Sequence, residues 1–168
     1  MSITATATQN FEPIPLGVHA AICVGLFDLG TSINEMFGNR AHRVCITWEF
    51  PQIRIQLIKD GEILELPRQL SQLFTLSLSE KANLRKVLTS WRGRSFTDGE
   101  LRGFDLKAIL GKPCSISILH DHKNGKTYSK IGAVLPTMVK GINAESPLLS
   151  YDFDVNGRNI PEGVPQWI

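Results

Sequence analysis

The chain has few of the residues that cross-link small proteins or bind metals. Its 168 residues include only three cysteines, Cys23, Cys45 and Cys114, which lie far apart and form no CxxC pair. An odd number of separated cysteines indicates neither a disulfide scaffold nor a zinc ribbon. We therefore expect buried free thiols in a protein of a reducing, cytoplasmic compartment.

Long hydrophobic runs and an N-terminal basic region are also missing. The longest apolar stretch, residues 16–29, is interrupted by His19 and Asp28 and is too short to span a bilayer. No Lys or Arg precedes Arg40, so the chain lacks the basic start of a signal peptide. These two absences predict a soluble protein that has no membrane partner.

No motif in the sequence indicates catalysis. GxSxG, HExxH and the P-loop lysine motif are missing, and Gly30-Thr31 is not followed by the further glycines of a dinucleotide fingerprint. His120 and His122 have a spacing that a metal could use, but no third ligand is evident nearby in the sequence. We therefore predict a protein that is not an enzyme and uses neither a cofactor nor a metal.

Neither sign of charge dominates the whole chain, because 18 Lys and Arg residues face 16 Asp and Glu residues. Their distribution is uneven, however. Residues 80–130 hold eleven basic and five acidic side chains, a net charge of +6, whereas the rest of the chain carries −4. A basic central third predicts a surface that faces a polyanion, although Lys and Arg are also ordinary surface residues.

The chain does contain enough apolar residues to build one core. Hydrophobic residues make up 42% of it and charged residues 20%, in a length typical of a single domain. Residues 1–15 are small, polar and punctuated by proline, which indicates a flexible N-terminal arm. We expect residues 16–138 to form the domain, and residues 139–168, which show no clear periodicity, to form a C-terminal extension.

Alternation of apolar and other residues predicts strands on both sides of one helical segment. Asp60-Gly61 and Asn124-Gly125 are typical two-residue hairpin turns, because such turns require positive φ angles. The predicted strands cover residues 18–27, 43–50, 53–58, 62–66, 73–78, 114–119 and 127–135.

Apolar residues then change to the spacing of a helical face, which is kept by Leu84, Val87, Leu88 and Trp91. Ser77 and Glu80 fit a capping box at the start of this helix, and Gly93 is expected to end it. A second capping box, Thr97 with Glu100, predicts a further short helical stretch that ends at residue 110.

Three or four strands, one helix and two further strands form the element order of the OB-fold. We therefore predict a mainly β protein, a small antiparallel barrel with one helix between its third or fourth strand and its final hairpin. Residues 28–40 are expected to be a loop, Pro51 to end its strand or place it at an edge, and the Asp60-Gly61 hairpin to elaborate the third strand. A β-sandwich is the competing architecture, in which a helix at this position is less usual.

Single-stranded nucleic acid is held by cations that follow its phosphates and by aromatic faces on which its bases stack. Residues 90–96 offer both kinds of group around Gly93. The hairpin over residues 120–130 offers both again, in a connection that normally contacts the ligand of an OB barrel. The candidate nucleic-acid-binding residues are Arg43, Trp48, Arg54, Trp91, Arg92, Arg94, Lys112, His122, Lys123, Lys126, Tyr128 and Lys130.

Several of these side chains also have an ordinary structural explanation. Trp91 ends an apolar helical stripe, and Trp48 shares a strand face with Val44, so both patterns are typical of core residues. Arg43 and Arg54 lie opposite the apolar strand faces. They contact phosphates if that side is the concave groove of the barrel, and otherwise they contact solvent.

Residues 17–135 resemble a family of small phage and prophage proteins. The similar segments are VGLFDLGTS, ITWEF and SLSEKANLRKVLTSWRGRSFTDGELRGFDLKAILGKPCSISILHD. Members of this family are encoded with replication and recombination functions and are regarded as OB-fold single-stranded-DNA-binding proteins. The resemblance implies a sequence-tolerant protein of the bacterial host cytoplasm that protects single-stranded DNA. Further candidate partners are a second copy of the chain and replication or recombination proteins.

The C-terminal residues depart from cellular single-strand binders, which usually end in a strongly acidic tail that recruits partners. Residues 150–168 contain only Asp152, Asp154 and Glu162 against Arg158. The sequence therefore does not predict partner recruitment through such a tail. An alternative function is that of an OB-like adaptor or structural phage protein whose basic third meets an acidic protein. Single-stranded RNA is a further alternative ligand, which only a contact to the 2′-hydroxyl would distinguish from DNA.

Overall fold

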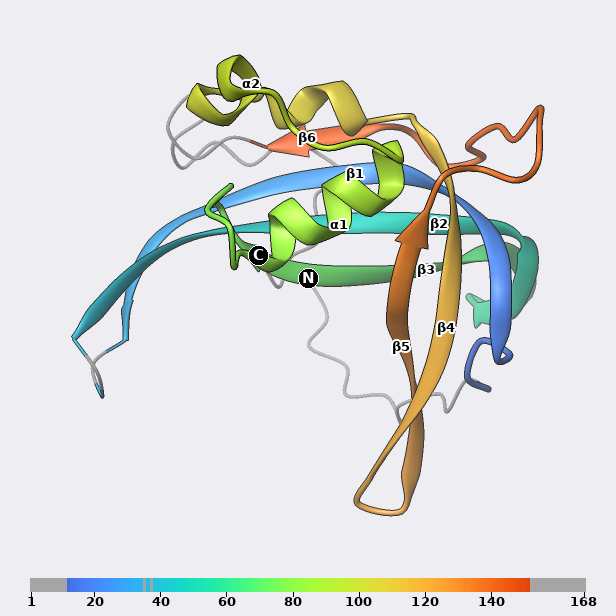
Figure 1. Cartoon of the computed structure of the whole chain (residues 1–168). Coiled ribbons are helices and arrows are strands. Elements are labelled where there is room, and N and C mark those ends of the chain that lie inside the picture. The colour runs from blue at the N-terminus through green and yellow to red at the C-terminus, as the bar shows by residue number, and fades with distance from the viewer. Residues whose placement is uncertain (1–11, 35, 37, 152–168) are drawn as a thin grey trace.

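The computed structural model describes residues 12–34, 36 and 38–151. Its five main strands form one antiparallel sheet in the order β3-β2-β1-β4-β5, to which the short β6 adds by pairing parallel with β1. The sheet is strongly curled, so that β4 and β5 run across β1, β2 and β3 (Figure 1). The elements are β1 (Gly17–Asn34), β2 (Asn39–Lys59), β3 (Glu62–Thr75), α1 (Asn83–Arg92), α2 (Asp98–Arg102), the 3-10 helix η1 (Leu106–Ile109), β4 (Pro113–Lys123), β5 (Lys126–Leu135) and β6 (Leu149–Tyr151).

This architecture is an OB-like half-barrel and confirms the predicted fold class. In the part of the chain that the structure describes, β3 and β5 are the two edges of the main sheet order and are not paired with each other. The helix α1 follows β3 in the chain and contacts both edge strands. The predicted position of one helix between the third strand and the final hairpin is therefore confirmed.

The hydrophobic core fills the concave side of the sheet. Trp48 and Phe50 of β2 are completely buried, as are neighbouring apolar side chains of the same face. The Trp48 ring lies 6.4 Å from the Phe74 ring of β3 and 6.0 Å from the Trp91 ring of α1, measured between ring centroids. Burial of each large side chain contributes roughly 1.5–3 kcal/mol to the free energy of folding. These aromatic contacts therefore stabilise the packing of α1 on the sheet.

The helix α1 packs on the core with the face that the sequence predicts, since Leu84, Leu88 and Trp91 are buried. It ends at Gly93, whose φ of 69° is left-handed, as expected for a helix C-terminus. The capping box predicted from Ser77 is wrong. The helix begins only after Ala82, and the Ser77 hydroxyl accepts a hydrogen bond from the backbone of Ser79 instead.

The two helical segments that follow α1 are short. The capping box at Thr97 and Glu100 is confirmed, because each side chain accepts a hydrogen bond from the backbone N–H of the other residue. It opens only α2, and a separate 3-10 turn, η1, follows it before β4. The single stretch predicted to reach residue 110 is therefore two pieces.

The loop predicted over residues 28–40 is wrong, because β1 continues to Asn34 and β2 begins at Asn39. The turn-forming residues make an irregularity within β1, where the pairing with β2 shifts between Asp28 and Thr31. Gly30 takes a φ of 70° there, and its N–H donates to the Asp28 carboxylate at 2.8 Å. A β-bulge uses the same residue types as a loop, which explains the misinterpretation.

Pro51 neither ends its strand nor lies in a regular ladder. The pairing of β2 with β3 shifts between Phe50 and Arg54, and β2 then continues to Lys59. A bulge tolerates a residue that has no N–H to donate. Both predicted hairpin turns are confirmed, since Asp60 and Asn124 have positive φ angles of 52° and are followed by left-handed glycines.

Both ends of the described chain pack against the barrel. Of the predicted flexible arm, residues 1–11 lie outside the described residues, but Ile14 is buried. Its N–H donates to the Ser129 hydroxyl at 2.7 Å, and its carbonyl lies 2.7 Å from the His120 ring, so this part is fixed to β4 and β5. In the predicted C-terminal extension, β6 pairs with β1, and residues 152–168 lie outside the described part.

Candidate nucleic-acid interface

The hairpin of β4 and β5 extends well beyond the rest of the sheet (Figure 1). Residues paired across an antiparallel ladder share a face, and faces alternate along each strand. The register therefore places Lys123 opposite Lys126, Asp121 opposite Tyr128 and Leu119 opposite Lys130, all on one face of the ribbon. We call this set the lysine–tyrosine face, formed by Leu119, Asp121, Lys123, Lys126, Tyr128 and Lys130.

The lysine–tyrosine face is open to solvent. Its three lysines are exposed, and half of the Tyr128 side chain is accessible. Lys123 and Lys126 face each other directly across the strands, an arrangement of like charges that destabilises a hairpin unless an anion compensates it. Proteins that bind single-stranded nucleic acid combine cations with exposed aromatic rings, and this face has both, with one carboxylate, Asp121, opposite Tyr128.

The opposite face of the hairpin is structural at its base. His120 and Ser129 lie there, and both hold Ile14. His122 shares this face, where its Nδ1 lies 3.0 Å from the Thr127 hydroxyl. The structure therefore separates His122, a predicted binding residue, from the three lysines.

Arg54 is occupied by acidic side chains. Its guanidinium forms ion pairs with Glu65 of β3, at 3.0 Å, and with both carboxylate oxygens of Glu145. These hydrogen bonds hold the pKa of Glu145 below its ordinary value, so the contact persists at neutral pH. Arg54 is consequently not a free phosphate contact in this structure.

A buried glutamate fixes the same segment to the sheet. Glu49 of β2 is completely buried, and its carboxylate accepts hydrogen bonds from the backbone N–H groups of Glu145, at 2.8 Å, and Ser146, at 3.1 Å. The Ser146 hydroxyl also accepts one from Gln69 at 3.0 Å. Residues 145–146 therefore lie over strands β2 and β3, the part of an OB-fold that commonly faces a ligand. No pattern in the sequence indicated this coverage.

The two candidate tryptophans are core residues. Trp48 is 0% exposed and Trp91 is 7% exposed, and the Trp91 N–H donates to the Pro113 carbonyl at 3.0 Å. Neither ring can stack with a base in this structure, so their prediction as binding residues is wrong. The reason is that the apolar face of β2 turns into the half-barrel rather than out of it.

Arg92 connects α1 with α2. Its guanidinium forms an ion pair of 2.6 Å with Glu100 and lies 4.3 Å from the centre of the Phe96 ring and 5.5 Å from that of Phe104. Arg94 and Lys112 are exposed, and together with Arg92 they line one hollow beside α1. Three predicted binding residues are thus brought together, but away from the hairpin tip.

Arg43 lies in a separate place. It is exposed at the outer side of β2 and lines a hollow with Lys81, Ser77 and Ser79, next to the start of α1. The twelve candidates therefore do not form one continuous groove. Only Lys123, Lys126, Tyr128 and Lys130 share one exposed face of a single hairpin.

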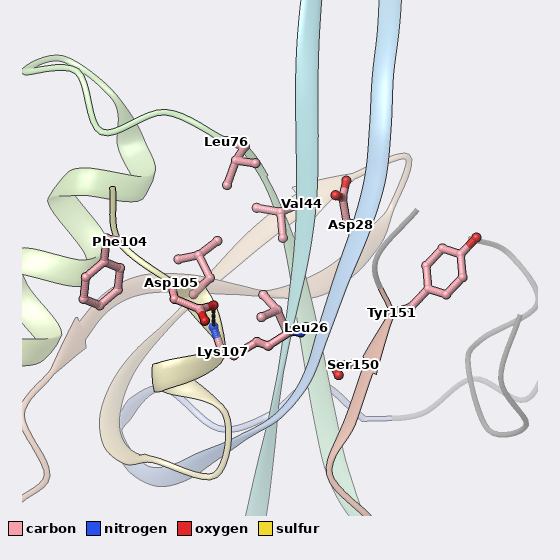
Figure 2. A pocket seen from close by; sticks show the side chains of 10 residues that line it. Leu26, Asp28, Val44, Leu76, Phe104, Asp105, Lys107, Ser150 and Tyr151 are labelled. Carbon is pink, nitrogen blue, oxygen red and sulfur yellow. Dashed lines mark hydrogen bonds between the residues drawn. The ribbon is translucent and has the colours of Figure 1, made fainter. Parts of the chain in front are cut away.

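A further pocket, which no sequence pattern predicted, lies between β1, β2, η1 and β6. Leu26 and Val44 contribute apolar walls, and Asp28, Asp105 and Tyr151 lie around them (Figure 2). Asp28 is already bonded to His42 and to the backbone of Gly30, and Asp105 accepts from the backbone of the 3-10 turn. Lys107 also lines this pocket, so its two carboxylates stand beside one cation and the pocket is not a basic site of the kind that the sequence predicts.

Cys23, Cys45 and Cys114 are buried free thiols, as expected. Among the described residues, no group of three His, Cys, Asp or Glu side chains could hold a metal ion. None of the helices in the described ranges is long and apolar enough to cross a membrane.

The chain matches no protein-family model, and no curated protein is significantly similar to it.

Proposed function

We propose that this protein binds single-stranded DNA with little sequence preference and protects it, without catalysing a reaction. The observation that carries this proposal is the lysine–tyrosine face on the projecting hairpin of an OB-like half-barrel. The lysines would neutralise phosphates and release their counterions, and Tyr128 would stack on a base. Neither interaction reads a base edge, so both tolerate any sequence.

The choice of DNA, and a role in phage replication or recombination, rest on the resemblance of residues 17–135 to phage and prophage proteins. The comparisons with known proteins add no support to that part. Homo-oligomers and replication or recombination proteins are proposed as partners on the same ground. The chemistry of the hairpin supports a single-stranded nucleic acid, and RNA is the competitor in the same assay.

The test is fluorescence anisotropy of a labelled dT oligonucleotide of about thirty nucleotides, a length that spans at least one OB-fold site. The protein is titrated at low and at moderate salt, with a matched duplex and an RNA strand as competitors. We expect tight, salt-sensitive binding that duplex does not displace. Equal competition by duplex, or no binding at low salt, would overturn the proposal.

The double variant Lys123→Ala/Lys126→Ala tests the hairpin itself. Because each lost contact to a single strand reduces the slope of log K against log salt by about 0.7, we expect weaker binding and a slope about 1.4 smaller. Lys86→Ala/Lys140→Ala is the matched control, since it removes two exposed lysines that lie outside the hairpin. Equal effects of the two double variants would mean that general charge, and not the hairpin, attracts the strand.

A further inference from the structure

A second basic surface lies at the other end of β4. A hollow of about 470 Å³ opens between α1, η1, the start of β4 and the residues that follow β5. Lys112 immediately precedes β4, whereas the lysine–tyrosine face occupies the second half of that strand, from Leu119 to Lys123, so the two surfaces are separated along β4 (Figure 1). We call this site the α1 hollow, with Arg92, Arg94 and Lys112 as its cations.

The walls of the α1 hollow are apolar. Leu88, Trp91 and Ile109 are buried side chains of the core that reach it, and Pro113 and Pro136 complete it. Burial of an apolar side chain of a ligand here would therefore favour binding, by roughly 25 cal/mol of free energy for each Å² of apolar surface removed from water.

A nucleobase fits the α1 hollow poorly. The Trp91 N–H donates to the Pro113 carbonyl, and the Thr137 hydroxyl donates to the Val139 carbonyl at 2.7 Å, so neither of these two donors is available to a base edge. The Phe104 ring packs edge-on against Phe96 and lies beneath Arg92. A base in the hollow would lose hydrogen bonds to water without finding an open ring on which to stack.

The rim of the α1 hollow has more positive than negative charge. Arg92 is paired with Glu100, but its Nη1 is buried and has no hydrogen-bond partner among the described residues. Arg94 and Lys112 are exposed and form no ion pair within the described part of the chain. The complementary ligand carries carboxylates around a bulky apolar group.

We propose that the α1 hollow docks an acidic peptide segment of a partner protein, with one bulky apolar side chain inserted and its carboxylates on Arg94 and Lys112. This goes beyond the proposed function, because it gives the protein a second site of different chemistry. A protein with both sites would connect a bound single strand to the partner. Each site would still bind its own ligand when the other site is empty.

The test uses a labelled synthetic peptide of aspartates around a single phenylalanine, and the same peptide with serine in place of the phenylalanine. Both are titrated with the full chain by fluorescence anisotropy. Arg94→Ala/Lys112→Ala removes the two exposed cations. Ala108→Trp fills the hollow from η1, where Ala108 is exposed and lines it. Lys86→Ala/Lys140→Ala is again the control for lost charge, and thermal unfolding confirms that each variant is folded.

We expect the phenylalanine peptide to bind and the serine peptide to bind more weakly. Loss of the two cations should weaken binding about tenfold, a change typical of two partly solvated ion pairs. Ala108→Trp should prevent peptide binding and leave oligonucleotide binding unchanged. If that variant fails to fold, Ala108→Leu is the smaller obstruction for the same comparison.

Three results would overturn the α1 hollow as a peptide site. The phenylalanine peptide does not bind, the two peptides bind equally, or Ala108→Trp weakens oligonucleotide binding as much as Lys123→Ala/Lys126→Ala does. The last result would assign the hollow to nucleic acid. A protein that binds the peptide but no oligonucleotide would instead contradict the proposed function alone.

Discussion

Substitution of Tyr128 can distinguish an effect on DNA binding from an effect on folding. Half of its side chain is exposed on a projecting hairpin, so Tyr128→Ala removes little of the core. If the ring stacks on a base, this variant should weaken oligonucleotide binding by about 1–3 kcal/mol and leave the unfolding temperature almost unchanged. Anisotropy titration and thermal unfolding measure the two quantities.

Tyr128→Phe is the matched variant, because it keeps the ring and removes only the hydroxyl. It should bind like the unmodified protein. A loss as large as that of the alanine variant would show that the hydroxyl, and not stacking, makes the contact. Loss of folding in Tyr128→Ala would mean that the ring is part of the structure.

Individual residues were predicted well where one property decides their place. The three cysteines are apolar enough to be buried, and burial raises the pKa of Cys23 to about 12, so this thiol stays protonated at neutral pH. Trp48 and Trp91 were ambiguous, because a large aromatic ring suits both a core and a stacking surface. Only the curvature of the sheet decides between these two places, and curvature is a property of many strands together.

At the scale of the elements, the contact between Glu49 and residues 145–146 can be tested by one substitution. The Glu49 carboxylate accepts one hydrogen bond on each oxygen, from the N–H groups of Glu145 and Ser146. Glu49→Gln keeps the size of the side chain but replaces one of these oxygens with an NH₂ group, which then faces a backbone N–H. A buried donor left without an acceptor costs about 1–3 kcal/mol, so the free energy of unfolding in urea should fall by that amount. Hydrogen exchange at Glu145 and Ser146 should become faster as well.

Glu65→Gln is the control for Glu49→Gln. Glu65 forms an ion pair with Arg54 near the same segment, but 56% of its side chain is exposed. In the Glu65→Gln variant, Arg54 would still form its ion pair with Glu145. Surface ion pairs contribute little, so the expected change is below about 1 kcal/mol. Equal effects of the two variants would contradict a special role for the buried carboxylate.

Elements were predictable where their signals are local. The hairpin turns at Asp60 and Asn124 need positive φ angles, and α1 shows its period within three turns. Bulges were not predictable, because Gly30 and Pro51 carry the same sequence signals in a bulge as in a loop. A strand continues past such a residue because it pairs with a neighbouring strand. The residues of that neighbour are distant in the sequence, so no local pattern shows the pairing.

For the molecule as a whole, element order was enough to predict the OB-like half-barrel, since few folds place one helix between these strands. The candidate site was predicted only in part. Lys123, Lys126, Tyr128 and Lys130 fall on one face because their spacing on a hairpin is local. The cover of β2 and β3 by residues 145–146, and the distance between the hairpin tip and the α1 hollow, depend on long-range packing that no local pattern contains.

The two proposed sites lead to a prediction about the whole molecule. Because the α1 hollow lies at the start of β4 and the lysine–tyrosine face on its second half, an oligonucleotide and an acidic peptide should bind at the same time. Anisotropy of a labelled oligonucleotide, titrated in the presence of saturating unlabelled phenylalanine peptide, should give the same dissociation constant within about twofold, because screening falls off over roughly 10 Å. The Ala108→Trp variant provides the baseline without bound peptide. Mutual displacement that persists at moderate salt would mean that the two ligands share one surface, and the separate sites would then be wrong.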